Sequence, residues 1–425
     1  MTGETGGRRE RHGENVRYRD VLANREFRGM IIAQIASEAG DQVARVALAL
    51  LVLDRTGSPL LAAATFAVSF LPVVIGGPLL GPLADRFSRR NLMLLADLGR
   101  AVGIALLALI AVPGAPLWLL FLVLVVAELF TPLFDSARAA SIPDILGRPE
   151  LVNAGLGLSR SLNLVNQAVG LLLGGAIVQL TGSRSALMID AVSFVVSFAI
   201  LYVSLERRPA RLEAMESLGM LVSDMLEGGR HLFADPSRRA MVLLMWALAA
   251  PLAAPEAVAL AYARDTGESD VWGGALMGSV VVGAAIGAVL VARRPLLVQL
   301  DLMLPLAAVM SLPLLVTGIE PPVALLALLW CAAGAAQAFM IPTMAFLTLF
   351  TPNEQRGRVV GLASAGFMGL TALGYLVAGA IATSTSPAFA VTVMASVALV
   401  IVAVIYLVWP AARLRTAVRG LATSS

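Results

Sequence analysis

The stretch GPLADRFSRR, residues 81–90, places one aspartate and three arginines between two long apolar segments. Across the whole chain, 58% of residues are hydrophobic and 14% are charged, whereas an average soluble domain is about a quarter charged. The composition excludes an ordinary soluble protein and indicates a chain that lies largely in a membrane. A charged side chain near the bilayer centre costs at least about 2.5 kcal/mol, so we expect the chain to leave the membrane at residues 81–90.

Apolar segments like the two that flank this stretch recur along the whole chain. A helix needs about 20 apolar residues to cross roughly 30 Å of hydrocarbon. Segments of this kind predict an all-α membrane protein with twelve transmembrane helices. They lie at residues 28–53, 60–84, 91–112, 116–136, 153–180, 186–205, 240–262, 271–292, 296–317, 322–350, 357–383 and 387–409.

Arginines are distributed unevenly between alternate loops of this topology. An even number of spans puts both termini on one side; 25 arginines lie on that side, and only Arg55, Arg184 and Arg264 lie on the other. Positive charge is enriched in cytoplasmic loops. We therefore expect a multi-pass protein of the inner (cytoplasmic) membrane with both termini in the cytoplasm. The expected parts are a tail at 1–27, a six-helix bundle at 28–205, a linker at 206–239, a second six-helix bundle at 240–409 and a tail at 410–425.

The linker contains apolar residues at helical spacing between residues 218 and 233. This pattern predicts an amphipathic helix on the inner membrane surface. We interpret it as a connection between the two halves rather than as a partner-binding site.

The two halves align with each other when the chain is shifted by 204 residues. Arg89-Arg90 then falls on Arg293-Arg294, Asp97 on Asp301 and Gly170 on Gly374. Two six-helix repeats joined by a cytoplasmic linker are typical of transporters that bind substrate between the halves and expose it alternately to either side.

Residues 81–90 resemble the loop between helices two and three of the major facilitator superfamily. The matching positions are Gly81, Leu83, Ala84, Asp85, Arg86, Arg89 and Arg90, and Ser88 replaces a glycine of the motif. The resemblance implies the major facilitator fold, with two pseudo-symmetric six-helix halves.

Other stretches are similar to the drug:proton antiporter branch that includes macrolide-efflux and siderophore-export proteins. They are SEAGDQVARVALALLVLDRTGS in the first span, DLGRA in the third, IDAVSFVVSF in the sixth and EGGRHLF before the seventh. This resemblance implies efflux of drugs or hydrophobic metabolites. Residues 170–175 lack the proline of the antiporter pattern, which weakens the antiport assignment more than it weakens export.

Asp85 is the residue of the motif that topology alone does not explain. It lies where the second span meets the cytoplasm and could accept hydrogen bonds from a neighbouring helix N-terminus or an arginine, forming a gate on one side. Arg86, Arg89 and Arg90 could contact anionic lipid headgroups or simply anchor the topology.

Charged residues inside the predicted spans are candidates for function because they are expensive there. Glu38, Asp41 and Arg45 share one face of the first span, and the two acids lie near its middle. We expect them to bind a proton or substrate; a structural ion pair with Arg45 is the alternative. Glu128 and Arg160 are possible partners in the same cavity.

The remaining polar residues of the spans suggest structural or cavity-lining roles. Asp97 and Arg100 are i, i+3 neighbours, and Asp97 matches Asp301 in the repeat, so we expect a latch near the cytoplasmic face. Trp246 and Gln337 are candidates to line the substrate cavity. The depth of Asp190 and Glu256 is left open by the sequence.

Other function classes have little support in the sequence. The one cysteine and two histidines form no metal-binding pattern, and no Walker phosphate loop is present, so we expect neither an enzyme nor an ATP-driven pump. The expectation is a monomeric secondary transporter that uses no cofactor, contacts membrane lipids and no nucleic acid, and exchanges a small molecule for protons. A siderophore or lysophospholipid exporter and a transport-inactive sensor are the alternatives.

Overall fold

Each predicted span coincides with helical structure in the computed structural model, which describes residues 18–208 and 227–423, without the side chains of 73–86 and 421–423. The predicted linker helix falls partly outside these ranges; its described part, residues 227–234, is helical. Ten helical segments are long and apolar enough to cross a membrane. The other two spans are the 32-residue α2, which contains Glu38, Asp41 and Arg45, and the 28-residue α3. The all-helical membrane fold is thereby confirmed.

The first half comprises a short N-terminal helix and seven further helices. They are α1 (Tyr18–Leu22), α2 (Arg25–Thr56), α3 (Pro59–Arg86), α4 (Arg89–Ile110), α5 (Leu117–Glu128), α6 (Phe130–Leu146), α7 (Pro149–Thr181) and α8 (Ser183–Ser204).

The second half repeats the arrangement and adds a helix at its end. Its elements are α10 (Pro236–Asp265), α11 (Asp270–Ala292), α12 (Leu296–Leu315), η1 (Val316–Ile319), α13 (Val323–Ala336), η2 (Gln337–Phe339), α14 (Met340–Leu349), α15 (Asn353–Ser384), α16 (Pro387–Val408) and α17 (Ala411–Thr423).

The fourth span of each half is interrupted near its middle. In the first half, α5 gives way to α6 at Leu129. In the second half, the short 3-10 helix η2 separates α13 from α14. Interrupted helices at corresponding positions of two repeats commonly mark binding sites in transporters, because the break frees backbone groups and redirects side chains.

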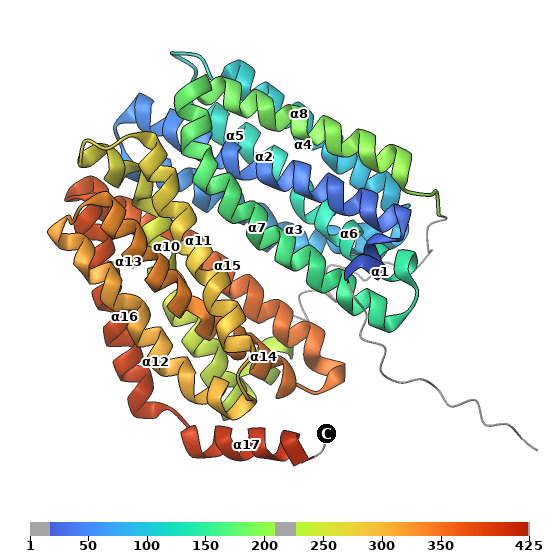
Figure 1. The fold of residues 1–425 in the computed structure, drawn as a ribbon, viewed down its shortest axis with the longest axis vertical. Coiled ribbons are helices and arrows are strands. Elements are labelled where there is room, and N and C mark those ends of the chain that lie inside the picture. Colours follow the sequence, from blue (N-terminus) through green and yellow to red (C-terminus); the bar gives the residue numbers. More distant parts are fainter. Residues whose placement is uncertain (1–17, 209–226, 424–425) are drawn as a thin grey trace, which may run out of the picture.

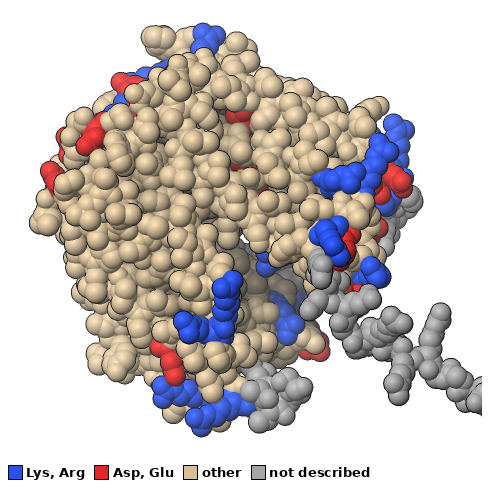
Figure 2. Space-filling view, in the orientation of Figure 1, with Lys and Arg blue, Asp and Glu red and all other residues tan. Residues whose placement is uncertain are grey.

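The two halves form the arms of a V and diverge toward the side that carries α1 and α17 (Figure 1). They are in contact at the opposite side, where α3 packs on α15 and α7 packs on α11. The space-filling view shows a hollow between the diverging arms, with basic side chains beside it (Figure 2). The molecule is thus closed at one end and open at the end that carries α1 and α17.

The closed end depends on close backbone approach between the halves. A Cβ atom at Gly175 of α7 would overlap the carbonyl oxygen of Asp270, at the start of α11, and one at Gly379 of α15 would lie 2.9 Å from Leu60 Cα. Arg264, in the last turn of α10, forms an ion pair with Asp54 of α2 and another with Asp270, the latter at 2.9 Å. We call these contacts between α3 and α15, between α7 and α11, and at Arg264 the seal.

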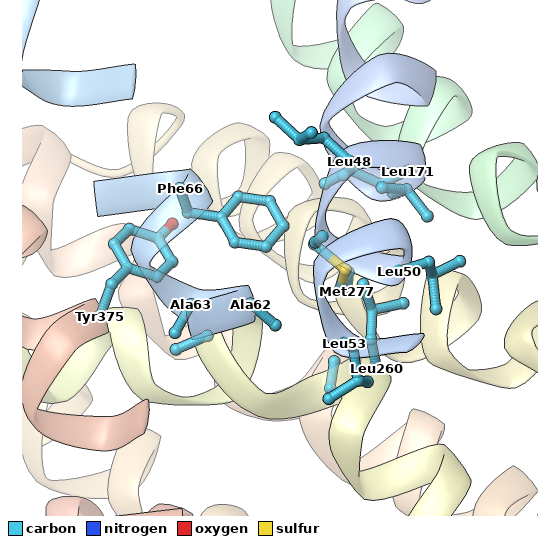
Figure 3. Packing of buried hydrophobic residues seen from close by; sticks show 14 of the residues in the cluster. Leu48, Leu50, Leu53, Ala62, Ala63, Phe66, Leu171, Leu260, Met277 and Tyr375 are labelled. Carbon is cyan, nitrogen blue, oxygen red and sulfur yellow. The ribbon is translucent and has the colours of Figure 1, made fainter. Parts of the chain in front are cut away.

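The largest hydrophobic cluster extends across the seal. It includes Leu48 and Leu53 of α2, Leu171 of α7, Leu260 of α10 and Met277 of α11, which lie along α2 (Figure 3). Two further clusters lie within the separate halves. Apolar packing therefore joins the halves at the closed end and stabilises each arm separately at the open end.

Candidate functional site

A small charged cavity of about 20 Å³ lies inside the first half. Asp41 and Arg45 come from α2, Glu128 is the last residue of α5, and Asp190 comes from α8. The hydroxyl-bearing residues Thr65 and Ser69 of α3 also line it. We call this the N-half cavity. The structure brings together three of the five residues predicted as proton-coupling or cavity charges.

Arg100 of α4 connects this cavity to a buried aspartate. Its guanidinium donates to Asp97 Oδ1 at 2.7 Å and lies 3.7 Å from Asp41 Oδ2. It is sandwiched between the rings of Phe134 and Phe194, at 4.5 and 4.3 Å from their centroids. Cation–π contacts of this kind are strongest where water is excluded, so Arg100 is held in one position.

The predicted latch residues Asp97 and Asp301 occupy different environments. Asp97 is fully buried, and its Oδ2 accepts a hydrogen bond from Ser197 of α8 at 2.6 Å. Asp301 of α12 is exposed and pairs with Arg415 of α17 at 2.9 Å. Asp97 and Arg100 therefore stabilise the interior of the first half, whereas Asp301 attaches the C-terminal helix.

Glu38 does not pair with Arg45, the partner expected if these charges formed a structural ion pair. It accepts hydrogen bonds from Arg138 at 2.8 Å, Gln34 at 3.1 Å and Asn166 at 3.1 Å. The predicted fourth span ends at residue 136 and places Arg138 in a loop. The structure extends that span through α6 and turns Arg138 toward α2.

Arg45 has no ion pair with Glu38 or Asp41 in the described part of the chain. Its electrostatic partners are Glu128 and Asp41 of the first half and Glu256 of the second half. Arg45 therefore lines the N-half cavity and also interacts with a charge of the second half.

A second cavity, of about 320 Å³, lies between the halves on the open side of the seal. We call it the central cavity. Most of its lining is apolar, and its polar residues are Glu256, Gln337, Thr371 and Tyr375. Gln337, a predicted liner, reaches it from the interruption of the tenth span. The lining residues are Phe70, Leu164, Leu252, Ala253, Glu256, Ala284, Ala288, Gln337, Ala338, Met340, Ile341, Phe367, Thr371 and Tyr375.

Tyr375 connects the central cavity to both halves. Its hydroxyl donates to Glu256 Oε2 at 2.7 Å. Its ring stacks on Phe66 and Phe70 of the first half, with centroids 5.5 and 5.7 Å away; Figure 3 shows the ring of Tyr375 beside that of Phe66. The sequence identified Glu256 as an acid within a span but gave no sign of its tyrosine partner, because 119 residues separate the two.

Trp246 of α10, the other residue predicted to line the cavity, packs against α15. Its indole N–H donates to the carbonyl oxygen of Ala363 at 2.9 Å, and its ring lies against Phe233. Arg160 of α7 is exposed. Neither side chain belongs to the lining of the two cavities described above.

The motif of residues 81–90 is described only in part. The side chains of Gly81, Leu83, Asp85 and Arg86 lie outside the described residues. Arg89 donates to the carboxylate of Asp144 and to the carbonyl of Ala140 in α6. Arg90 donates to the carbonyl oxygen of Tyr202 at 2.7 Å and lies over its ring. Both arginines thus attach the start of α4 to neighbouring helices of the same half.

A family model described as transmembrane secretion effector matches residues 20–418. The chain is 28% identical over 174 residues to the uncharacterized MFS-type transporter YfiS of Bacillus subtilis, covering 41% of this chain and 40% of that protein. It is 27% identical over 354 residues to the multidrug efflux pump Tap of Mycobacterium bovis, covering 79% and 82%. Macrolide efflux protein A of Streptococcus pyogenes is 25% identical over 197 residues, covering 46% and 48%. The chain thus spans about two fifths of the length of YfiS and about half that of the macrolide protein.

Solved transporter structures share the fold at low sequence identity. The nucleoside transporter NupG superposes with a TM-score of 0.70 at 16% identity, covering 91% of this chain and 99% of NupG. The peptide transporter POT, in complex with sulfate, gives 0.72 at 15% identity and covers 94% and 99%.

Proposed function

The chain belongs to the transmembrane secretion effectors of the major facilitator superfamily, and we propose that it exports hydrophobic or amphiphilic small molecules in exchange for protons. The observation that carries this proposal is the central cavity, which both halves line and which is sealed at one end only. A cavity of this kind can release its occupant to the other side if the halves rock about it. Transport then needs no covalent chemistry and no cofactor.

The cavity lining favours an apolar or amphiphilic cargo. Aromatic and aliphatic side chains dominate it, including Phe70, Leu252 and Phe367. A sugar or nucleotide would require more polar partners than Glu256, Gln337, Thr371 and Tyr375 provide, because unpaired polar groups are expensive to bury. The printed names of the efflux relatives, macrolide efflux protein A and multidrug efflux pump Tap, agree in kind with such a cargo.

Buried carboxylates support proton coupling as the energy source. Asp41, Glu128 and Asp190 surround the N-half cavity, where charge is costly and protonation relieves that cost. Loading and releasing a proton there would change the charge in the cavity that Arg45 lines, and Arg45 interacts electrostatically with Glu256 of the second half. The proton gradient could thereby bias the rocking motion.

Orientation follows from the arginine distribution. We place both termini, and hence the open end, in the cytoplasm of a cell whose inner membrane holds the protein. The linker at 206–239 would then join two bundles, 28–205 and 240–409, that move as separate bodies. Asp85 would act as a latch that closes the cytoplasmic end when the seal opens.

Accumulation assays in cells that lack their own efflux pumps test this function. Cells with and without the protein are loaded with erythromycin, rhodamine 6G, a siderophore or a lysophospholipid, and the retained amount is measured. We expect lower retention of erythromycin or rhodamine 6G, and restored retention when an uncoupler removes the proton gradient. Equal retention of every compound would contradict export, and export of the siderophore or lysophospholipid alone would identify a specific exporter. Export that continues after uncoupling would contradict proton coupling.

A further inference from the structure

Asp190 is the most deeply buried carboxylate of the N-half cavity. Its exposed fraction is 0%, and it lies on α8 where that helix packs against α2 and α4. Oδ1 accepts one hydrogen bond, from Ser193 at 3.1 Å. Oδ2 has no hydrogen-bond partner within the described residues, although Asp190 lines the cavity. A buried polar atom without a partner costs free energy, and a charged one costs more.

Neighbouring helices restrict Asp190 to its present position. A methyl group at Gly40 of α2 would lie 2.5 Å from both Asp190 Oδ1 and Ser193 Oγ. The backbone of α2 therefore packs directly against the carboxylate. Asp190 has little freedom to turn toward water or toward a distant cation.

The charged groups that face Asp190 do not neutralise it. From α2 it meets Asp41 and Arg45, from α4 Arg100 and from α5 Glu128. Arg100 already donates to Asp97 and lies against Asp41. With Asp97 included, this group holds four carboxylates and two guanidiniums, so full ionisation would leave two uncompensated negative charges in a buried space.

Glu38 and Asp41, the predicted coupling acids, are better satisfied than Asp190. Glu38 has an arginine, a glutamine and an asparagine as partners. Asp41 lies 3.7 Å from Arg100 and is partly accessible. Glu128 also has a single hydrogen bond, from Thr131, and no ion pair within the described residues, but it is only half-buried. Asp190, fully buried and without an ion pair in that part of the chain, is therefore the carboxylate that gains most from a proton.

We propose that Asp190 is the binding site of the coupling proton. Oδ2 accepts the proton from hydronium that enters the N-half cavity, forming a neutral carboxylic acid and water, and returns it when the cavity faces the opposite side. Release of the proton restores a negative charge in the cavity that Arg45 also lines, and Arg45 interacts electrostatically with Glu256, the partner of Tyr375. This inference rests on the proposed proton coupling and adds the residue that performs it.

Infrared difference spectroscopy of the full-length protein in lipid nanodiscs tests the site without any substrate. A pH titration of wild type should produce a carbonyl-stretch band from a protonated carboxyl group. We expect this band to be lost in Asp190→Asn and retained in Glu38→Gln, the matched control. In Ser193→Ala the band should shift to higher frequency, because the hydrogen bond to Oδ1 is lost; this variant still tests the site if Asp190→Asn does not fold.

Any one of the following outcomes would overturn the assignment. They are a band that persists in Asp190→Asn, a band that is lost in Asp41→Asn but not in Asp190→Asn, and the absence of any titrating carboxyl band in wild type. A band unaffected by Ser193→Ala would also contradict it. Because no transported compound is present, failure of the export assays leaves this result unchanged, so the two proposals can fail separately.

Discussion

Asp97 and Asp301 occupy the same place in the sequence repeat but have opposite surroundings. Asp97 is enclosed by Arg100 and Ser197 within the first half, whereas Asp301 lies exposed and pairs with Arg415. The same difference holds for the halves as a whole. The first half contains a network of buried ionic groups, while the cavity-lining part of the second is apolar except for Glu256, Gln337, Thr371 and Tyr375. The two copies of one scaffold thus differ in chemistry: the first half holds a buried ionic network, and the second supplies most of the lining of the central cavity.

The largest effect that distinguishes the halves should come from the two arginines that pair with these aspartates. Arg100→Met would leave Asp97 buried without its cation, which typically costs about 3–5 kcal/mol. Arg415→Met removes an exposed ion pair, worth about 0–1 kcal/mol. Thermal unfolding of both variants in detergent measures the difference. Equal losses would show that the buried network is not specific to the first half.

The difference between the halves matters for transport only if they move as separate bodies about the seal. Gly175→Leu would push α7 away from the start of α11, since overpacking costs about 1–3 kcal/mol. We expect the ratio of molecules open at the sealed end to molecules closed there to rise roughly 5- to 150-fold. Distances between spin labels at residues 183 and 268, with Cys331 replaced by alanine, report this shift. The control is Gly157→Leu in the same helix, where a side chain would enter open space. Similar distance changes in both variants would contradict a role of the seal in holding the halves together.

A smaller effect is expected at the main polar pair of the central cavity. Tyr375→Phe keeps the stacking on Phe66 and Phe70 but removes the donor to Glu256, which should cost about 1–3 kcal/mol. Tyr262→Phe is the matched control, because the buried hydroxyl of Tyr262 has no partner within the described residues. Tyr262→Phe should leave the unfolding temperature unchanged or raise it. If Tyr375→Phe also leaves the unfolding temperature unchanged or raises it, the hydrogen bond between Tyr375 and Glu256 does not stabilise the second half.

The smallest effect concerns the surface of the second half, at Asp235. Burial raises the pKa of Asp235, but hydrogen bonds from the backbone N–H groups of Arg238 and Ser237, with the charge of Arg413, outweigh it and hold the pKa below its ordinary value. The ionised form therefore stabilises the folded state above about pH 4, and this contribution disappears as the pH falls through the lower folded pKa. Asn can also cap a helix N-terminus, so Asp235→Asn isolates the charge. It should cost about 0.5 kcal/mol at pH 7, and an equally large loss in strong acid would contradict the assignment.

Much of the fold could be predicted from the sequence because the bilayer constrains it strongly. Apolar length placed the twelve helices, and the repeat at 204 residues indicated two halves. The pairing of Asp97 with Arg100 was also accessible, since residues three apart share a helix face. The interruption after Glu128 was not, because Leu129 and Phe130 are as apolar as the helices on either side.

The partners of the candidate acids could not be predicted for a different reason. Glu38 meets Arg138 across 100 residues, and Asp190 meets Asp41 through packing of α8 on α2. Neither contact leaves a periodic signal in the sequence. The signal that was available, the cost of an acid inside a span, identified Asp190 and Glu256 as unusual but gave no depth for either.

A measurement of proton movement during export tests most directly whether the first half binds the coupling proton. In everted membrane vesicles, the compound with the strongest export in the accumulation assay is added, and the pH change of the lumen is recorded for wild type, Asp190→Asn and Tyr262→Phe. We expect equal proton movement in wild type and Tyr262→Phe. We expect none in Asp190→Asn, although this variant still binds the compound. Proton movement in Asp190→Asn equal to that of wild type would contradict this expectation.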